Sequence, residues 1–318
     1  MLYPSEIILE VTNRCNVRCR FCHFHGESAV RKRPLGVMPD GVWKRVLEDV
    51  ESWIGETEQV VLCFHGAGEP LLHPKLKEIL SRARGIRGAS IGFMTNGMLL
   101  DRSWARFLVD LPVDWVWFSI DGNSPLINDR YRKGSRLEKI VRNVEGLIEE
   151  KERLGSGLPV LNFNMVAYPD VGEKEIDSYL KKWVPYAGCV SISKFRPIPS
   201  KRLLSEEERR RISYRPCPLL YRQMVISWDG KVGLCCEDIN MEVVLGDVTE
   251  EGILEIFNGK RACQVRALHE RGERERISLC RECDVWASDE VLSEGEREIS
   301  GVKVKVLEKP SGVVYIRL

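Results

Sequence analysis

Short apolar runs alternate with helical patterns through the first 195 residues of the chain. Such runs are typical of strands that are buried on both faces of a parallel sheet. Between them, apolar residues such as Val42, Val46 and Val50 recur at the spacing of one helix face. We expect strands over 6–11, 59–64, 89–95, 115–119, 160–166 and 189–195, with helices beginning near 40, 74, 102, 137 and 173. This alternation predicts an α/β fold with a parallel sheet, open or curled toward a barrel.

The pattern changes after residue 195. A proline-containing segment with the charged run 206–211 predicts a connector with one helical stretch. A hairpin follows around Asp229-Gly230, then two helices over 249–258 and 260–270 and a terminal hairpin over 302–316. We therefore expect three parts, which are a first domain over 1–196, a connector over 197–214 and a small α+β domain over 215–318.

Composition narrows the class of protein. The 48 basic residues nearly balance the 47 acidic ones, so the charge supplies no overall attraction to nucleic acid. The longest apolar run, 60–64, is far shorter than the roughly 20 residues that span a bilayer. The first residues have neither the basic nor the apolar region of a signal peptide, so we expect a cytoplasmic protein. Scarce glutamine beside abundant Glu, Lys and Arg indicates a thermophilic source.

Three of the eleven cysteines, Cys15, Cys19 and Cys22, lie within one loop after the first strand. In a reducing compartment, spaced cysteines point to metal binding or catalysis rather than disulfides. Three thiolates suit a [4Fe–4S] cluster that keeps one iron open for another ligand. His23 and His25 could instead complete a zinc site, so the residues alone leave both readings open.

The Cys-x3-Cys-x2-Cys spacing, with an aromatic residue before the last cysteine, resembles the signature of radical S-adenosylmethionine (SAM) enzymes. The resemblance implies a partial (β/α)6 barrel and a [4Fe–4S] cluster whose open iron binds the methionine part of SAM. It also implies that the cluster passes an electron to SAM, yielding a 5′-deoxyadenosyl radical that abstracts hydrogen from a substrate. The electron donor would be a protein such as ferredoxin or flavodoxin.

A turn of small residues ends the second expected strand. Small residues let a ligand approach the backbone, although a plain turn before a helix would have the same composition. The turn resembles the Gly-Gly-Glu-Pro element with which radical SAM enzymes bind the amino group of SAM. Ala67 replaces the second glycine of that element. The resemblance thus assigns cofactor binding to Gly66, Ala67, Gly68, Glu69 and Pro70.

Later strand ends supply further candidate cofactor residues, and turn chemistry would explain each of them singly. By resemblance, Arg132 is the expected partner of the SAM carboxylate, because arginine binds carboxylates in bidentate fashion; Arg130 is its competitor. The remaining candidates lie at or near strand ends and are Asn96, Ser119, Asp121 and Asn164.

A second cysteine group contains Cys217, Cys235, Cys280 and Cys283. The Cys-x2-Cys pair is a common metal half-site, and a structural zinc is the alternative to a cluster. The spacing resembles the SPASM or shorter twitch extension of radical SAM enzymes, which implies an auxiliary [4Fe–4S] cluster with four protein ligands. Within the doublet 235–236, spacing favours Cys235 over Cys236.

The resemblance implies that the protein oxidises or otherwise modifies a small-molecule or peptide substrate. The pattern is most like short members with one auxiliary cluster, among them aminocyclitol dehydrogenases and peptide- or cofactor-modifying enzymes. Lys194 and Arg196 follow the sixth strand and could bind or deprotonate a substrate, although an ordinary solvated charge would explain either of them. Arg196 is the candidate catalytic residue. The alternatives are a maturase for a peptide or protein partner and, in a different class, a structural zinc-binding protein.

Overall fold

The computed structural model describes residues 1–57, 59–195, 204–287 and 289–318. The chain divides into two compact units, each assembled from separate segments. Unit 1 contains Met1–Cys15, Val30–Phe93 and Lys201–Ala287. Unit 2 contains Asn16–Ala29, Met94–Ser200 and Ser288–Leu318. The three-cysteine loop therefore has Cys15 in unit 1 and its other two cysteines in unit 2.

Unit 1 has a mixed sheet. The first strand lies between two parallel neighbours, and an antiparallel extension follows on one side. In spatial order the strands are β11 (Val244–Asp247), β10 (Lys231–Gly233), β9 (Gln223–Ile226), β1 (Glu6–Leu9), β3 (Val60–Cys63) and β4 (Ala89–Thr95). The helices are α1 (Asp40–Trp53), α2 (Leu76–Arg84), α7 (Glu206–Arg211), α8 (Leu219–Arg222), α9 (Ile253–Asn258) and α10 (Lys260–Glu270). Short 3-10 turns are η1 (Ile54–Glu56), η2 (Pro70–Leu72), η4 (Arg274–Arg276) and η5 (Val285–Ala287).

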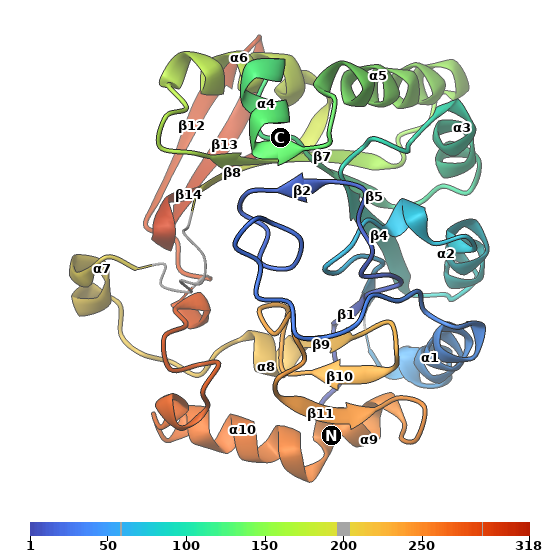
Figure 1. Ribbon diagram of the computed structural model, residues 1–318, viewed down its shortest axis with the longest axis vertical. Coiled ribbons are helices and arrows are strands. Elements are labelled where there is room, and N and C mark those ends of the chain that lie inside the picture. Colours follow the sequence, from blue (N-terminus) through green and yellow to red (C-terminus); the bar gives the residue numbers. More distant parts are fainter. Residues whose placement is uncertain (58, 196–203, 288) are drawn as a thin grey trace. The chain divides into compact units, whose positions relative to one another are not determined.

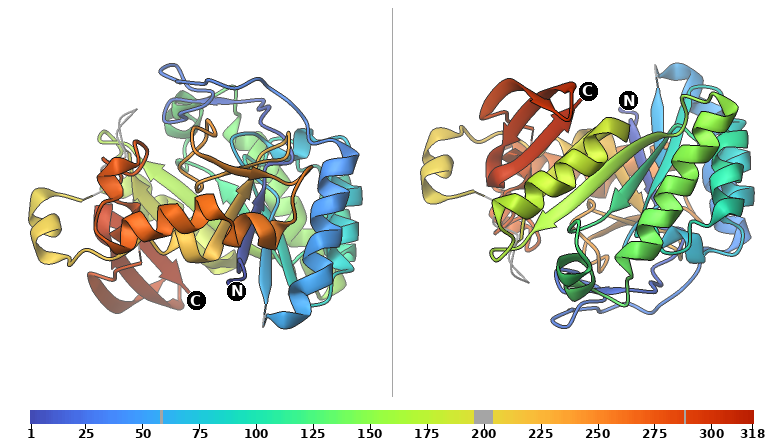
Figure 2. Two further views of the ribbon diagram at one scale, coloured as in Figure 1. Left: turned by 90° about the horizontal axis from the view of Figure 1, so that it is seen from below. Right: turned by 90° about the horizontal axis from the view of Figure 1, so that it is seen from above.

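Unit 2 continues the strand–helix alternation. Its parallel strands are β5 (Trp115–Ser119), β7 (Val160–Ala167) and β8 (Ala187–Lys194). Antiparallel strands extend the edge of β8 in the order β14 (Val313–Arg317), β13 (Val302–Lys309) and β12 (Ser293–Ile299). These three strands are labelled in Figure 1 and coloured red in Figure 2. A separate ribbon pairs β2 (Arg18–Cys19) with β6 (Arg132–Lys133). The helices and turns are α3 (Arg102–Asp110), α4 (Pro125–Tyr131), α5 (Leu137–Leu154), α6 (Glu173–Trp183), η3 (Val184–Tyr186) and η6 (Pro310–Gly312).

Burial of the periodic apolar faces explains these elements. In unit 1 the predicted stripe of α1, including Val46, Leu47 and Val50, is wholly buried. In unit 2 the ring of Phe163 on β7 stacks on Trp183 of α6, with ring centroids 4.6 Å apart. Removing such apolar surfaces from water is the main favourable term in folding. The expected strands and helices of the first 195 residues are confirmed, with ends that differ by a few residues.

The C-terminal segment differs from the expectation. The predicted terminal hairpin is present as β13 and β14, but β12 adds a third strand and β14 pairs with β8. Residues 289–318, which the sequence grouped with the small domain, thus extend the sheet that contains β8. Pairing at a sheet edge is made by the backbone, so it leaves little trace in side-chain periodicity. The boundaries 1–196, 197–214 and 215–318 otherwise stay a prediction.

Within the described ranges, no helix is both long enough and apolar enough to cross a membrane.

The stacked core of unit 2 can be tested by substitution. Trp183→Ala removes a side chain that is 1% exposed and packed on Phe163. We expect it to lower the free energy of unfolding by about 3–5 kcal/mol, because a large cavity remains. Lys174→Ala, at an exposed position of the same helix, should change it by less than about 0.5 kcal/mol. Denaturant unfolding measures both; equal midpoints for the two variants would contradict this account of the core.

Candidate cofactor-binding sites

In unit 1 the backbone is fixed just before Cys15. The Thr12 hydroxyl donates to the carbonyl oxygen of Gly36 at 2.7 Å. The Asn13 side chain accepts from the backbone N–H of Gly36 at 2.7 Å and donates to the carbonyl oxygen of Pro34 at 2.8 Å. The first cysteine of the loop therefore follows a segment whose polar groups are held by the chain that precedes α1.

The Gly66–Pro70 turn is bonded to the same segment. The backbone N–H of Glu69 donates to the carbonyl oxygen of Arg14 at 2.8 Å. A Cβ at Gly68 would stand 2.5 Å from the carbonyl oxygens of Thr12 and Arg14, so only glycine fits there. The buried Glu69 carboxylate accepts from the backbone N–H of Leu71 at 3.2 Å. The structure thus joins this turn to the residue before Cys15, while cofactor binding by Gly66, Ala67, Gly68, Glu69 and Pro70 stays a prediction.

A buried ion pair supports this turn, and the sequence analysis missed it. Glu10 is 2% exposed. Its two carboxylate oxygens each accept a hydrogen bond from one terminal nitrogen of Arg33, both at 2.5 Å. Its Oε2 also accepts from the backbone N–H of Ala67 at 3.0 Å. The Nε of Arg33 donates to the carbonyl oxygen of Ile239 at 2.6 Å. The available signal was a carboxylate within an otherwise apolar run, since buried charges are rare unless paired.

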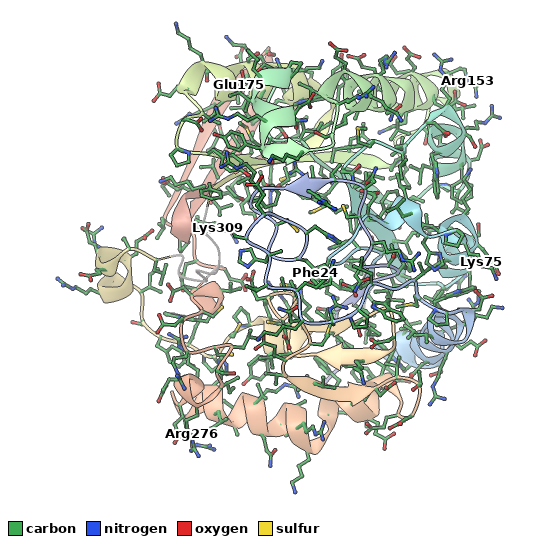
Figure 3. The ribbon with its side chains drawn as sticks, in the orientation of Figure 1. Phe24, Lys75, Arg153, Glu175, Arg276 and Lys309 are labelled. Carbon is green, nitrogen blue, oxygen red and sulfur yellow. The ribbon has the colours of Figure 1, made fainter. Side chains whose placement is uncertain are left out.

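In unit 2 the loop through Cys19 and Cys22 folds as a tight turn. The backbone N–H of Cys22 donates to the carbonyl oxygen of Cys19, and that of Gly26 to the carbonyl oxygen of Cys22, both at 3.0 Å. The Sγ of Cys22 accepts from the backbone N–H of His25 at 3.2 Å. The side chain of Phe24 is buried (Figure 3). The sulfur of Cys22 therefore already has one hydrogen-bond donor from its own loop.

Arg132 is brought beside Cys19 by the pairing of β6 with β2. Its Nη1 lies 3.5 Å from the Sγ of Cys19, and its Nη2 donates to the Oδ1 of Asp121 at 2.8 Å. The same oxygen accepts from the backbone N–H of Val166 at 2.9 Å. Burial alone would lower the pKa of Arg132, but the charges of Asp121 and Cys19 raise it above its usual value. A permanent positive charge therefore stands beside one cysteine of the loop.

This geometry bears on the role expected for Arg132. Two of its nitrogens already have neighbours, while its Nε and the Oδ2 of Asp121 are buried and have no hydrogen-bond partner among the described residues. Its competitor, Arg130, pairs instead with Asp170 at an exposed position. The assignment of Arg132 and Asp121 to the cofactor stays a prediction.

Two of the three other strand-end candidates of unit 2, Asn96 and Asn164, have side-chain partners within the protein. Asn96 donates to the side-chain oxygen of Asn16 at 2.7 Å, within the three-cysteine loop. Asn164 donates to the hydroxyl of Ser191 at 2.7 Å. Ser119 is half-buried at the end of β5. Cofactor binding by these residues stays a prediction.

The loop after β5 is held from α6. The Glu175 carboxylate accepts from the backbone N–H groups of Asn123 at 2.6 Å and Ser124 at 2.9 Å (Figure 3). Lys194, at the end of β8, is exposed, and its side chain lies over Gly312. Arg196, the predicted catalytic residue, lies outside the described residues.

All four cysteines of the second group line one pocket in unit 1. The rest of its wall is mostly apolar, with three polar side chains, those of Glu237, His269 and Arg274. Cys236 is not among the lining residues and its side chain is exposed. The apolar members of the wall are Leu219, Leu220, Leu234, Leu279, Val285 and Trp286.

Arg274 and His269 are two of the polar side chains that line this pocket. The Nη1 of Arg274 donates to the carbonyl oxygens of both Cys280 and Cys283, the latter at 2.7 Å. The ring of His269 is 2% exposed, and burial, with a smaller contribution from the charge of Arg274, lowers its pKa to about 4. Its Nε2 and the indole N–H of Trp286 have no hydrogen-bond partner among the described residues.

The residues of the pocket fit an iron–sulfur cluster. A [4Fe–4S] cluster takes up to four thiolates, one on each iron, and its sulfurs accept hydrogen bonds from nearby N–H groups. Four thiols on the wall and two buried donors without an acceptor supply both requirements. In the part of the chain that the structure describes, no three His, Cys, Asp or Glu side chains are arranged to hold a single metal ion.

Comparison with known sequences identifies both regions. The profile of the Radical SAM superfamily matches residues 9–182, and that of the SPASM iron-sulfur cluster-binding domain matches residues 217–284. The second match favours a cluster over the zinc that the cysteine spacing left open. These matches imply SAM and a [4Fe–4S] cluster for the first region and further iron–sulfur binding for the second.

Curated relatives resemble part of the chain. The tungsten-containing aldehyde ferredoxin oxidoreductase cofactor-modifying protein of Pyrococcus furiosus is 29% identical over 164 residues, covering 50% of this chain and 43% of the relative. A probable GTP 3′,8-cyclase of Methanosarcina mazei is 28% identical over 189 residues, covering 57% and 51% respectively. The chain thus spans about half the length of the curated relatives it matches.

Solved structures share the fold. Crystallised anSMEcpe with bound AdoMet has a TM-score of 0.65 at 19% identity and covers 90% of both chains. BtrN in complex with AdoMet and 2-DOIA has a TM-score of 0.57 at 20% identity, covering 89% of this chain and 93% of BtrN. The predicted fold class, a partial (β/α)6 barrel followed by a small SPASM/twitch domain, is confirmed by these similarities. With more than half of its residues matched by the superfamily profile, the chain belongs to the radical SAM superfamily.

Proposed function

We propose that this protein is an enzyme that cleaves SAM reductively and abstracts hydrogen from a substrate, and that it also holds a second, auxiliary [4Fe–4S] cluster. Cys15, Cys19 and Cys22 would hold the first cluster. Cys217, Cys235, Cys280 and Cys283 would hold the second. When bound, the first cluster supplies the electron that cleaves the sulfonium of SAM. The observation that carries the proposal is one pocket lined by four cysteines in a chain that also has the radical SAM loop.

The protein's own residues position these groups. Arg132 places an N–H and a positive charge 3.5 Å from the Sγ of Cys19, which offsets the negative charge of a metal-bound thiolate. Asp121 orients that guanidinium through a 2.8 Å ion pair that is almost completely buried. The proposed SAM contacts are the Gly66–Pro70 turn with Asn96, Ser119, Arg132 and Asn164.

The proposed reaction is an oxidation or other modification of a small molecule or peptide. Three similarities support this range: a relative named as a cofactor-modifying protein, relatives named as GTP cyclases, and SuiB of Streptococcus suis, solved with its precursor peptide SuiA. SuiB has a TM-score of 0.65 at 14% identity, covering 84% of this chain and 67% of SuiB. The proposed substrate-contacting residue is Arg196. The proposed electron donor is ferredoxin or flavodoxin, and the proposed location of the protein is the cytoplasm.

SAM cleavage tests the first cluster. The anaerobically reconstituted protein, given dithionite and SAM, should form 5′-deoxyadenosine, which chromatography measures. The Cys15→Ala, Cys19→Ala, Cys22→Ala triple variant should lose this activity yet keep about four iron atoms per chain in the second site. Undiminished 5′-deoxyadenosine from the triple variant would refute the proposed ligands.

The second site predicts a difference between adjacent cysteines. Cys235 lines the pocket and Cys236 does not, so Cys235→Ala should lower the iron and sulfide bound by the auxiliary site or destabilise its cluster. The matched variant Cys236→Ala should keep the wild-type content of about eight iron atoms per chain. Iron and sulfide analysis measures both, and the reverse pattern would make Cys236 the ligand.

The buried ion pair predicts a stability difference. Glu10→Gln removes the charge but nearly keeps the shape, leaving the Arg33 guanidinium buried without its counter-charge. We expect a loss of about 3–5 kcal/mol in the free energy of unfolding, together with weaker SAM binding through the displaced Ala67 turn.

Glu242→Gln is its control, because Glu242 pairs with Lys32 at an exposed position. We expect a change of about 0.5 kcal/mol or less for it. Anaerobic denaturant unfolding compares the two variants. If Glu10→Gln unfolded at the same midpoint as the control, the ion pair would not hold the turn.

A further inference from the structure

His269 lines the auxiliary pocket and has one ring nitrogen without a hydrogen-bond partner among the described residues. Its ring belongs to the pocket wall and is 2% exposed. The two ring nitrogens have different surroundings. Nδ1 lies 3.4 Å from the backbone nitrogen of Cys217 and 3.4 Å from the hydroxyl oxygen of Tyr214. Nε2 is buried and has no hydrogen-bond partner among the described residues.

The contact with Cys217 decides which nitrogen carries the proton. A backbone N–H can only donate, so Nδ1 accepts from Cys217. The Tyr214 hydroxyl proton is directed to the carbonyl oxygen of His269, at 2.9 Å. In a neutral imidazole one nitrogen accepts and the other donates, and the proton of His269 therefore resides on Nε2. The ring is thus a fixed donor with no acceptor supplied by the described protein atoms.

The pocket indicates what the missing acceptor is. Its wall consists of four thiols, apolar side chains and three polar residues, one of them the cation Arg274. A second buried donor, the indole N–H of Trp286, also lacks a partner among the described residues. Two orphaned donors around four cysteines match the sulfurs of a cluster, which accept N–H bonds. An apolar ligand would leave both donors unsatisfied.

We propose that the Nε2–H of His269 donates a hydrogen bond to a sulfur of the auxiliary cluster and raises the reduction potential of that cluster. The inference rests on the proposed function, since it assumes that the four cysteines hold iron and sulfide. A hydrogen bond to sulfur stabilises the more electron-rich, reduced state, so its loss makes reduction harder. His269 is a positioning residue that also anchors the backbone of the ligand Cys217.

The test measures the auxiliary cluster alone. The full chain carrying Cys15→Ala, Cys19→Ala and Cys22→Ala is reconstituted anaerobically, and its remaining cluster is titrated while the reduced form is followed by electron paramagnetic resonance. Adding His269→Leu should lower the ratio of reduced to oxidised cluster about tenfold at a fixed potential, a negative shift of about 59 mV for a one-electron couple. His269→Gln restores an N–H near the position of Nε2 and should recover most of the shift.

Gln264→Leu, at an exposed position of the same helix, is the matched control and should leave the potential unchanged. A second measurement does not depend on any substitution at His269. With ¹⁵N-labelled histidine, the reduced cluster of the triple variant should show hyperfine coupling to one histidine nitrogen and to an exchangeable proton.

The outcomes separate the two proposals. Iron bound in the triple variant, with no histidine coupling or with an unchanged potential in His269→Leu, would overturn the hydrogen bond alone. Absence of any iron–sulfur cluster from the triple variant would overturn the proposed auxiliary site and this inference with it. A shift in His269→Leu that His269→Gln reverses would support the donor role over a purely structural one.

Discussion

The organisation of unit 1 depends on one buried carboxylate. Glu10 lies one residue after β1, and its charge is acceptable there only because Arg33 meets it with two parallel N–H bonds. Around this pair the chain has little freedom. A Cβ at Gly66 would stand 2.6 Å from the Glu10 side chain, the Ala67 N–H is bound to it, and Arg33 reaches on to Ile239. The strand exit, the glycine turn and the segment after β10 thus share one electrostatic anchor.

N–H donors accompany both cysteine groups, but the donors differ in charge. In unit 2 the Sγ of Cys22 accepts from a backbone N–H, and Cys19 has the guanidinium of Arg132 at 3.5 Å. In the auxiliary pocket the orphaned donors, His269 and Trp286, belong to neutral rings, while Arg274 is occupied with two carbonyl oxygens. A full positive charge stabilises an added electron more than neutral N–H dipoles do. We therefore expect clusters in the two sites to have different reduction potentials.

Much of the fold could be predicted because its strands are buried on both faces. Runs such as 59–64 are apolar throughout, and the cysteine spacing carries its chemistry in the sequence itself. Other features follow only from tertiary structure. Glu10 and Arg33 are 23 residues apart and have no local signal that pairs them. Nothing in the helix sequence distinguishes His269 from other polar residues. Its proposed role depends on the pocket that it lines, which only the tertiary structure reveals. The strand β12 was missed because its residues are almost all charged or exposed, and only pairing with β13 makes it a strand.

That charged strand has a consequence for how copies of the chain meet. In the sheet order of the described residues β12 is terminal, so one of its sides presents backbone groups that a strand from another molecule could pair with. Glu294, Glu296 and Glu298 line this strand and are exposed. Glu294 pairs with Lys305 of β13, so two such edges brought together would have to give up the hydration of charged side chains of both signs. The sheet can therefore remain open at its last strand with a built-in resistance to edge-to-edge aggregation.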